Sequence, residues 1–372
     1  MHTSIYAKFF VILAIAACSN TSQKQSPSIR LELLGQASIP HNHNFKATPI
    51  GGLSGLSYDP QTETYYVISD DRSDKAKARF YSFRLELNAE ERLENDGIQF
   101  EEVHFLRPKK DTYYPEGEID PEGIVFASDS LQYIVSEGIP GKDIAPFVNA
   151  YDDNGTLVEQ LPVPESYRTD TDTAGENYGV RNNLGFEGLT ASPDGTKLYA
   201  GIENALWQDG PEADAKSESP SRLIIYDLSA DSILHEYVYM VDRVHYESDQ
   251  TDMFAVNGLT ALLALDNTGR LLVLERSFVA GQGNRIALYS MNMKCATDIK
   301  GTFNLQRLEE SPQPAKKELV AYLNDFDITI DNFEGLTLGP RLKQGGRLLL
   351  MVSDNNFSDD QQTLFTAFRI EY

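Results

Sequence analysis

Short runs of apolar, β-branched and aromatic residues alternate with turn residues along almost the whole chain after residue 28. The segments 198–203, 222–226 and 271–275 are examples of such runs. Glycine, proline, asparagine and aspartate separate them, a pattern that is typical of β-strands joined by tight turns. The pattern therefore predicts an all-β protein.

One phrase, a polar residue followed by Gly-Leu or Gly-Ile and a short apolar run, occurs five times. Its glycines are 55, 123, 188, 258 and 335, so the intervals are 68, 65, 70 and 77 residues. Each copy continues with a turn, a second strand that ends in an acidic residue, and a third strand. Fainter fourth strands are expected near 101–106, 157–163, 235–241 and 318–323. A four-strand unit at a nearly constant interval predicts the blades of a β-propeller.

The repeat count predicts five blades, with a sixth blade hidden between residues 285 and 333 as the alternative. The fifth unit reaches the C-terminal Tyr372 without a fourth strand of its own. Residues 30–34 could supply that strand and close the ring, which would remove exposed strand edges that promote aggregation. We expect one ring, a single domain over residues 28–372, with no linker dividing it.

The N-terminus has the form of an export signal. Lys8 precedes an apolar run over 9–17, which is too short to span a bilayer as a helix, and Cys18 follows. The small residues before Cys18 are similar to the bacterial lipoprotein cleavage box. We therefore predict a signal peptide over 1–17 and lipidation of Cys18; the alternative is an ordinary signal peptide.

Residues 18–27 are polar and are expected to be a tether between the lipid anchor and the folded domain. The residues after the anchor, Ser19 and Asn20, do not resemble the acidic inner-membrane retention signal. The sequence thus predicts an exported lipoprotein of the cell envelope, with the outer membrane favoured.

The formal net charge of the whole chain is -24. Such a charge repels nucleic acid and anionic membrane surfaces, so we expect no nucleic-acid partner and membrane contact only through the anchor. It would also repel phosphate esters unless bound cations reverse the local potential. We expect a monomer with a small-molecule substrate.

The repeat places acidic residues on one face of the ring. If the Gly-Leu strand is innermost and the next strand is antiparallel to it, its start adjoins the end of the second strand. Residues before each glycine and at the end of each second strand would therefore surround one mouth of the central channel. The first set is Ser54, Glu122, Glu187, Asn257 and Glu334, and the second is Asp70, Glu137, Glu203, Glu275 and Asp354.

Carboxylates that converge in this way raise one another's pKa or require a cation. Hard oxygen ligands in a flexible ring suit Ca²⁺, so we predict a Ca²⁺ site or several. The alternative is structural, with each glutamate bonded to the backbone of a neighbouring blade. The predicted metal ligands are Asp70, Glu122, Glu137, Glu187, Glu203, Asn257, Glu275, Glu334 and Asp354.

Two arginines, Arg72 and Arg276, follow acidic strand ends and should lie on the same rim. Arginine binds phosphate oxygens through two parallel hydrogen bonds, although either residue could instead pair with the carboxylates beside it. We predict that both bind substrate, with Asn355 as a further substrate contact. Other catalytic schemes lack support, because the sequence contains no Gly-x-Ser-x-Gly, His-Glu-x-x-His, phosphate-binding glycine loop or Cys-x-x-Cys motif.

The ordered set of motifs resembles the phytase-like family labelled "esterase-like activity of phytase". The resemblance covers residues 45–372. It is carried by segments 51–59, 66–72, 120–124, 185–190, 272–278, 332–340 and 352–357, among them Gly-Phe-Glu-Gly-Leu-Thr at 185–190. It implies a secreted or envelope propeller that hydrolyses phosphoesters or other esters, loosely related to calcium-dependent propeller phytases. The site positions that it implies are Glu122, Glu187, Glu275, Arg276, Glu334 and Asp354.

These expectations combine into a metal-dependent hydrolase in which Glu187, Arg72 and Arg276 are catalytic. Glu187 would accept a proton, and the two arginines would hold the anionic group of the substrate. A lactonase-like Ca²⁺ propeller is a neighbouring alternative. A non-catalytic envelope propeller that binds a protein or a carbohydrate on its rim is the alternative from a different functional class.

Overall fold

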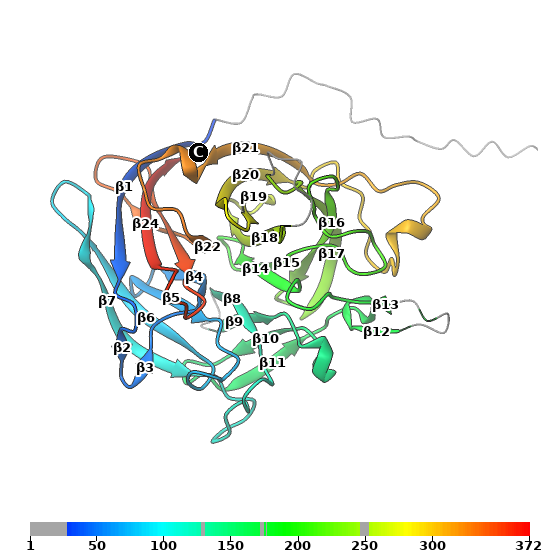
Figure 1. The fold of residues 1–372 in the computed structure, drawn as a ribbon, viewed down its shortest axis with the longest axis horizontal. Coiled ribbons are helices and arrows are strands. Elements are labelled where there is room, and N and C mark those ends of the chain that lie inside the picture. Colours follow the sequence, from blue (N-terminus) through cyan, green and yellow to red (C-terminus); the bar gives the residue numbers. More distant parts are fainter. Residues whose placement is uncertain (1–27, 128–130, 172–174, 176, 246–252) are drawn as a thin grey trace, which may run out of the picture.

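The computed structural model describes residues 28–127, 131–171, 175, 177–245 and 253–372. In these residues, five antiparallel sheets of four strands each surround a central channel (Figure 1). The predicted signal over 1–17, the lipidation site Cys18 and the tether over 18–27 lie outside the described residues.

Each blade runs from an inner strand at the channel to an outer strand at the edge of the ring. Blade 1 contains β4 (Leu53–Asp59), β5 (Thr64–Ser69), β6 (Arg79–Leu87) and β7 (Leu93–Phe105). Blade 2 contains β8 (Pro121–Phe126), β9 (Gln132–Ser136), β10 (Phe147–Tyr151) and β11 (Leu157–Leu161). Blade 3 contains β14 (Phe186–Ala191), β15 (Lys197–Ile202), β16 (Ser219–Asp227) and β17 (Ser232–Val241). Blade 4 contains β18 (Ala255–Ala264), β19 (Arg270–Val279), β20 (Gly283–Asn292) and β21 (Lys316–Tyr322).

Blade 5 is built from both ends of the chain. Its strands are β22 (Asn332–Arg341), β23 (Arg347–Asp354), β24 (Thr363–Glu371) and, on the outside, the N-terminal β1 (Arg30–Ile39). The first and last strands lie side by side in Figure 1, and their antiparallel register pairs Leu31 with Ile370 and Ala37 with Phe365. The predicted closure of the ring by the N-terminal strand is confirmed.

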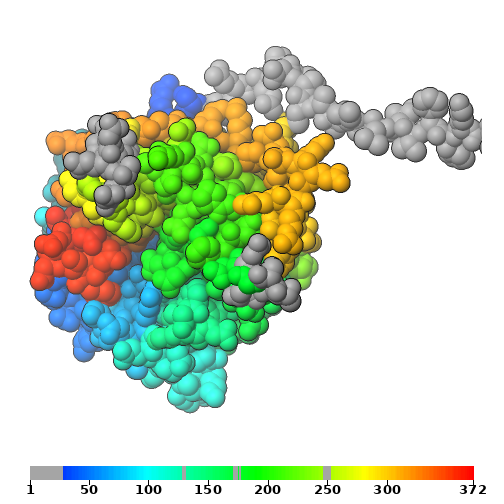
Figure 2. All heavy atoms as spheres, turned by 45° about the vertical axis from the view of Figure 1, so that its right-hand side comes forward, coloured from blue at the N-terminus to red at the C-terminus, as the bar shows by residue number. Residues whose placement is uncertain are grey.

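The long interval 285–333 holds no sixth blade, so that alternative is wrong. The interval continues from β20 through an excursion with the short 3₁₀ helix Leu305–Arg307 before the outer strand β21. The excursion packs on blade 3, where the amide of Ile299 donates to the Glu236 carbonyl at 2.8 Å. Figure 2 shows this segment, in orange, against the green surface of blade 3.

The connections between strands contain several smaller elements. They are the two-stranded pairs β2 (Asn44–Phe45) with β3 (Thr48–Pro49) and β12 (Asp170–Thr171) with β13 (Asn177–Tyr178), and further 3₁₀ helices at Pro140–Lys142, Glu165–Tyr167 and Leu323–Asp325. None of the helices in the described part of the chain has the length and apolar character required to cross a membrane.

The core is divided among the interfaces between blades. A separate apolar cluster fills each of the five interfaces, such as Tyr65, Val67 and Phe83 of blade 1 against Leu350 and Phe365 of blade 5. Middle strands face a neighbouring blade on both sides, so β23 is buried over almost its whole length. This burial explains why the second strands appear in the sequence as continuous apolar runs rather than as alternating ones.

The repeated glycine allows the inner strands to approach one another. A Cβ atom at Gly55 would lie 2.7 Å from the carbonyl oxygen of Glu122, and one at Gly123 would lie 2.6 Å from that of Glu187. Both contacts are with the backbone of the next blade, which cannot move away easily. The glycine therefore recurs because a ring of five blades brings neighbouring inner strands into direct contact.

Candidate functional site

Eight buried or partly buried carboxylates lie around the channel where the inner strands begin. We call this group the acidic mouth; it consists of Asp70, Asp120, Glu122, Glu137, Glu187, Glu203, Glu334 and Asp354. These carboxylates come from every blade except blade 4, and they interact electrostatically with one another. The structure thus brings together most of the carboxylates that the repeat placed on this face.

A β-bulge explains how acidic side chains reach the channel. In blade 3, Phe186 pairs with Ile202 and Gly188 with Gly201, so Glu187 is the extra residue without a partner in the ladder. In blade 5 Glu334 has the same position, between the pairs of Phe333 and Gly335. A bulged residue leaves the regular alternation of the strand and can be turned to a new direction.

Two sets of three carboxylates are close enough to share an ion. Asp70, Asp120 and Glu122 form one set, and Glu137, Glu187 and Glu203 form the other. Within each set, one oxygen from each residue lies within 4.8 Å of the others. We call them the first and the second carboxylate triad. Asp120 was missed by sequence reasoning, although it stands two residues before Glu122 in the same motif.

Some buried oxygens here have no hydrogen-bond donor in the part of the chain that the structure describes. Glu137 accepts a hydrogen bond from the Gly185 amide at 2.8 Å through Oε1, whereas its Oε2 has no partner among the described residues. Asn257 donates to the Asp242 carbonyl at 2.8 Å, and its Oδ1 is likewise buried without a partner. The bond from Gly185 to Glu137 joins neighbouring blades, which is the structural role that the sequence analysis gave as the alternative to metal binding. The unpartnered oxygens are the groups that a cation would satisfy.

Burial and mutual repulsion favour the protonated forms of these carboxyls. Burial is the largest cause and raises the pKa of Glu122, Glu137 and Glu187 well above the ordinary value, and neighbouring carboxylates raise it further. For Glu203, burial raises the pKa to about 7 even though the guanidinium of Arg276 opposes the shift. A divalent cation would reverse this balance and favour the charged forms.

The two predicted arginines lie at this mouth and already contact carboxylates. Arg276 donates to Glu334 at 3.1 Å and to Glu203 at 3.5 Å, so it connects blades 5 and 3. Its Nε is buried without an acceptor among the described residues. Arg72 donates from Nε to Asp120 at 2.6 Å and from Nη2 to Asn183 at 2.9 Å, and its side chain is 37% exposed.

Two other predicted residues point elsewhere. Glu275 faces blade 3, whose Tyr239 donates to it at 2.6 Å. It also accepts from Asn257 at 2.9 Å and from Lys317, both of its own blade. Asn355 uses its Oδ1 to accept the amides of Gly52 at 3.0 Å and Phe357 at 3.1 Å, which holds the turn after β23.

The position of Glu275 follows from a displaced bulge in blade 4. There the register shifts at Thr260 instead of the residue before the glycine, so Gly258 pairs with Arg276 and Leu259 with Glu275. A change of one position in register moves side chains to the opposite face of a strand. Arg276 therefore faces blade 5 and the acidic mouth, while Glu275 faces blade 3.

The stability of the metal-free protein is expected to fall as the pH rises. Glu203 has a pKa of about 7 in the folded protein and an ordinary value of 4.5, so the folded state holds its proton more tightly. Its contribution is fully present below pH 4.5 and is lost as the pH rises through 7. Glu122, Glu137 and Glu187 shift in the same direction.

The measurement is the melting temperature in EDTA across that pH window, repeated with excess Ca²⁺. We expect a decline in EDTA and little or none with Ca²⁺, because a bound cation favours the charged carboxylates. A metal-free melting temperature that is constant or rises across the window would show that these carboxyls are not held in the protonated form.

Comparison with known proteins identifies one matching family. The family described as "Phytase-like: Esterase-like activity of phytase" matches residues 48–357. An uncharacterized secreted protein of Arthroderma benhamiae is 27% identical over 205 residues, which are 49% of this chain and 38% of that protein. The chain thus spans well under half the length of this relative.

Solved structures give weaker similarity. A luciferin-regenerating enzyme is 12% identical, with a TM-score of 0.35. The aligned region covers 86% of this chain and 92% of that enzyme. The periplasmic gluconolactonase of Pseudomonas aeruginosa is 12% identical, with a TM-score of 0.32. The aligned region covers 86% of this chain and 88% of the gluconolactonase.

Proposed function

Because the chain belongs to the phytase-like family with esterase-like activity of phytase, we propose that it is a metal-dependent hydrolase of phosphoesters or other esters. The observation that carries the proposal is the pair of carboxylate triads at the channel, with buried oxygens that no donor in the described ranges satisfies. Without a cation, burial and mutual repulsion hold several of the carboxyls at the acidic mouth in the protonated form. A bound divalent cation would favour their charged forms, which are the forms that act as ligands.

The donor set fits Ca²⁺. Every candidate ligand offers a hard oxygen, and carboxylates from several blades supply the number and the flexibility that Ca²⁺ accepts. The residues that would hold it are the two triads, with Glu334, Asp354 and the Oδ1 of Asn257 as further oxygens. When bound, Ca²⁺ would polarise the ester or phosphoryl group and would offset the repulsion between the anionic mouth and an anionic substrate.

The chain's own residues would bind the substrate and move the proton. The Nε–H of Arg276 has no acceptor among the residues described, and Arg72 is partly exposed, so both can donate to an anionic group that enters the mouth. Glu187 is the proposed proton acceptor, because it belongs to the second carboxylate triad, where a bound cation would favour its charged, proton-accepting form. Asn355 is left out of this scheme, since its side-chain oxygen holds a turn.

Export is part of the proposal. The Arthroderma benhamiae relative is named a secreted protein, and this supports the signal peptide proposed for residues 1–17. Lipidation at Cys18 and an outer-membrane location stay predictions from the sequence. Their test is mass spectrometry of the mature N-terminus, where a chain that begins with an unmodified residue would contradict the lipid anchor.

The function is tested by titrating Ca²⁺ into EDTA-stripped protein while recording the melting temperature and hydrolysis. Suitable substrates are p-nitrophenyl phosphate, p-nitrophenyl acetate and a simple lactone, which covers the three classes of ester considered above. We expect a saturable rise in melting temperature, with hydrolysis of at least one substrate appearing over the same Ca²⁺ range. No response of either quantity to Ca²⁺ would contradict the proposal.

A rim pocket favours a second candidate function, binding of a carbohydrate without catalysis. Trp207 and Phe303 are 41% and 46% exposed and border a pocket of about 300 Å³ with Tyr178, Gln208 and Asn304. Exposed aromatic rings beside amide groups suit the apolar faces and hydroxyls of sugars. Stabilisation by Ca²⁺ without hydrolysis of any substrate would favour this candidate, and hydrolysis that depends on Glu187 would oppose it.

A further inference from the structure

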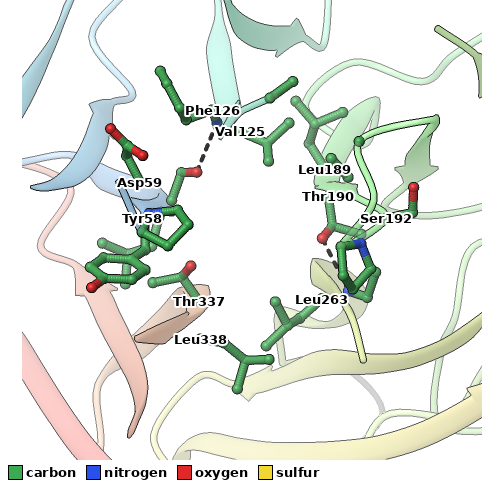
Figure 3. A pocket seen from close by; sticks show the side chains of 18 of the residues that line it. Tyr58, Asp59, Val125, Phe126, Leu189, Thr190, Ser192, Leu263, Thr337 and Leu338 are labelled. Carbon is green, nitrogen blue, oxygen red and sulfur yellow. Dashed lines mark hydrogen bonds between the residues drawn. The ribbon is translucent and has the colours of Figure 1, made fainter. Parts of the chain in front are cut away.

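The channel has a second opening with a different chemistry, at the end of the inner strands opposite the acidic mouth. A cavity of about 330 Å³ lies there, and residues of all five inner strands line it (Figure 3). Its walls combine aliphatic and aromatic side chains, among them Val125, Phe126, Leu189, Leu263 and Leu338 in Figure 3, with polar ones such as Thr337. We call it the apolar mouth.

The wall is held in shape by hydrogen bonds between blades. The Oγ of Ser57 in blade 1 accepts the Phe126 amide of blade 2 at 2.8 Å, and the Oγ1 of Thr190 in blade 3 accepts the Ala264 amide of blade 4 at 3.0 Å. Both bonds are dashed in Figure 3. The cavity is thus preformed, and its volume lies in the lower part of the range of about 300–1,000 Å³ for small-molecule sites.

One cation lies at the edge of this cavity without an ionic partner. Arg347 donates from Nε at 3.1 Å and from Nη2 at 2.8 Å to the carbonyl oxygen of Gly339. Among the described residues it makes no ion pair with a carboxylate, although the chain carries a net charge of -24. Asp59 is the one acidic residue among the described residues of the lining. It accepts from the Gln61 amide at 2.8 Å and from Thr62, so its own turn uses both oxygens.

We propose that the apolar mouth binds a small amphipathic carboxylate, such as a short fatty acid. The hydrocarbon part would pack on the aliphatic wall, and the carboxylate would bind the free edge of the Arg347 guanidinium. A multiply charged phosphate ester does not suit this opening, because one arginine is the only cation among the lining residues that the structure describes. The site is separate from the acidic mouth and does not depend on the proposed hydrolysis.

The test is calorimetric titration of the whole protein with octanoate, and with octanol as the uncharged comparison. We expect saturable one-site binding of octanoate and weaker binding of octanol. Arg347→Gln should weaken octanoate binding by about tenfold or more, since it removes a charge-assisted hydrogen bond. Lys343→Gln, an equal change of charge on the exposed turn before β23, should leave the affinity unchanged.

A second variant covers the case in which Arg347→Gln does not fold. Leu263→Trp keeps the cation and fills the cavity, and it should abolish octanoate binding. Glu187→Gln should bind octanoate as the wild type does, which separates this site from the acidic mouth. The proposal is overturned if the wild type shows no saturable binding, if octanol binds as tightly as octanoate, or if neither cavity variant changes the affinity.

Discussion

Replacing Glu187 by glutamine is expected to reduce Ca²⁺-dependent hydrolysis at least about 100-fold, the range for loss of a proton-transfer group. Glu187 belongs to the second carboxylate triad, and its side chain is buried. Glutamine has nearly the same shape but carries no charge and cannot accept the proton. The measurement is the initial rate on the best substrate as a function of Ca²⁺ concentration.

The same variant should show opposite changes in stability with and without the ion. Without Ca²⁺, Glu187→Gln should raise the melting temperature, because burial and the carboxylates of Glu203 and Glu137 disfavour a charge at this position. With Ca²⁺, the rise in melting temperature should be smaller than in the wild type, since a ligand is lost.

Glu86→Gln on the exposed part of β6 is the matched control and should behave as the wild type does. A purely structural glutamate would give lower stability under both conditions. That result, together with an unchanged rate, would remove Glu187 from the site.

Gly123→Ala is expected to destabilise the fold by about 3 kcal/mol, at the upper end of the usual range for overpacking. The added Cβ would lie 2.6 Å from the carbonyl oxygen of Glu187 and 2.9 Å from side-chain atoms of Leu189 and Val135. The closest neighbour is backbone of the next inner strand, so relief requires blades 2 and 3 to separate. Equilibrium unfolding in urea would measure the change.

Gly141→Ala provides the control for this substitution. It lies in the 3₁₀ helix Pro140–Lys142, and no atom lies within 4 Å of the position that its Cβ would occupy. We expect its free energy of unfolding to stay within about 0.5 kcal/mol of the wild type. Equal stabilities of the two variants would mean that the repeated glycine is not required for the close approach of the inner strands.

The two openings of the channel differ because the residues after the glycine of each inner strand are of a different kind from those before it. Before the glycine the strand carries Glu122, Glu187 or Glu334, and after it come aliphatic residues such as Val125, Leu189 and Leu336. Both halves of the pattern are local and repeat with the blade. The sequence therefore determined the number of blades, the closing role of β1 and the face on which the acidic residues gather.

Tertiary structure decided which of those residues meet. The bulge of blade 4 lies at Thr260, and nothing in the repeated phrase reveals this, so Arg276 faces the acidic mouth and Glu275 does not. Asp120 lies in the first triad beside Asp70 of another blade, and Arg72 of that blade donates to it at 2.6 Å. Arg347 comes to the apolar mouth from a second strand and not from the repeated phrase.

These differences have one physical reason. Strand pairing and alternation depend on neighbouring residues and can be predicted from the repeat. The direction of a single side chain in a bulge depends on register, where a shift of one residue exchanges the two faces of the strand. That register is set by packing between blades that lie more than 60 residues apart in the chain, as the intervals of 68, 65, 70 and 77 residues require.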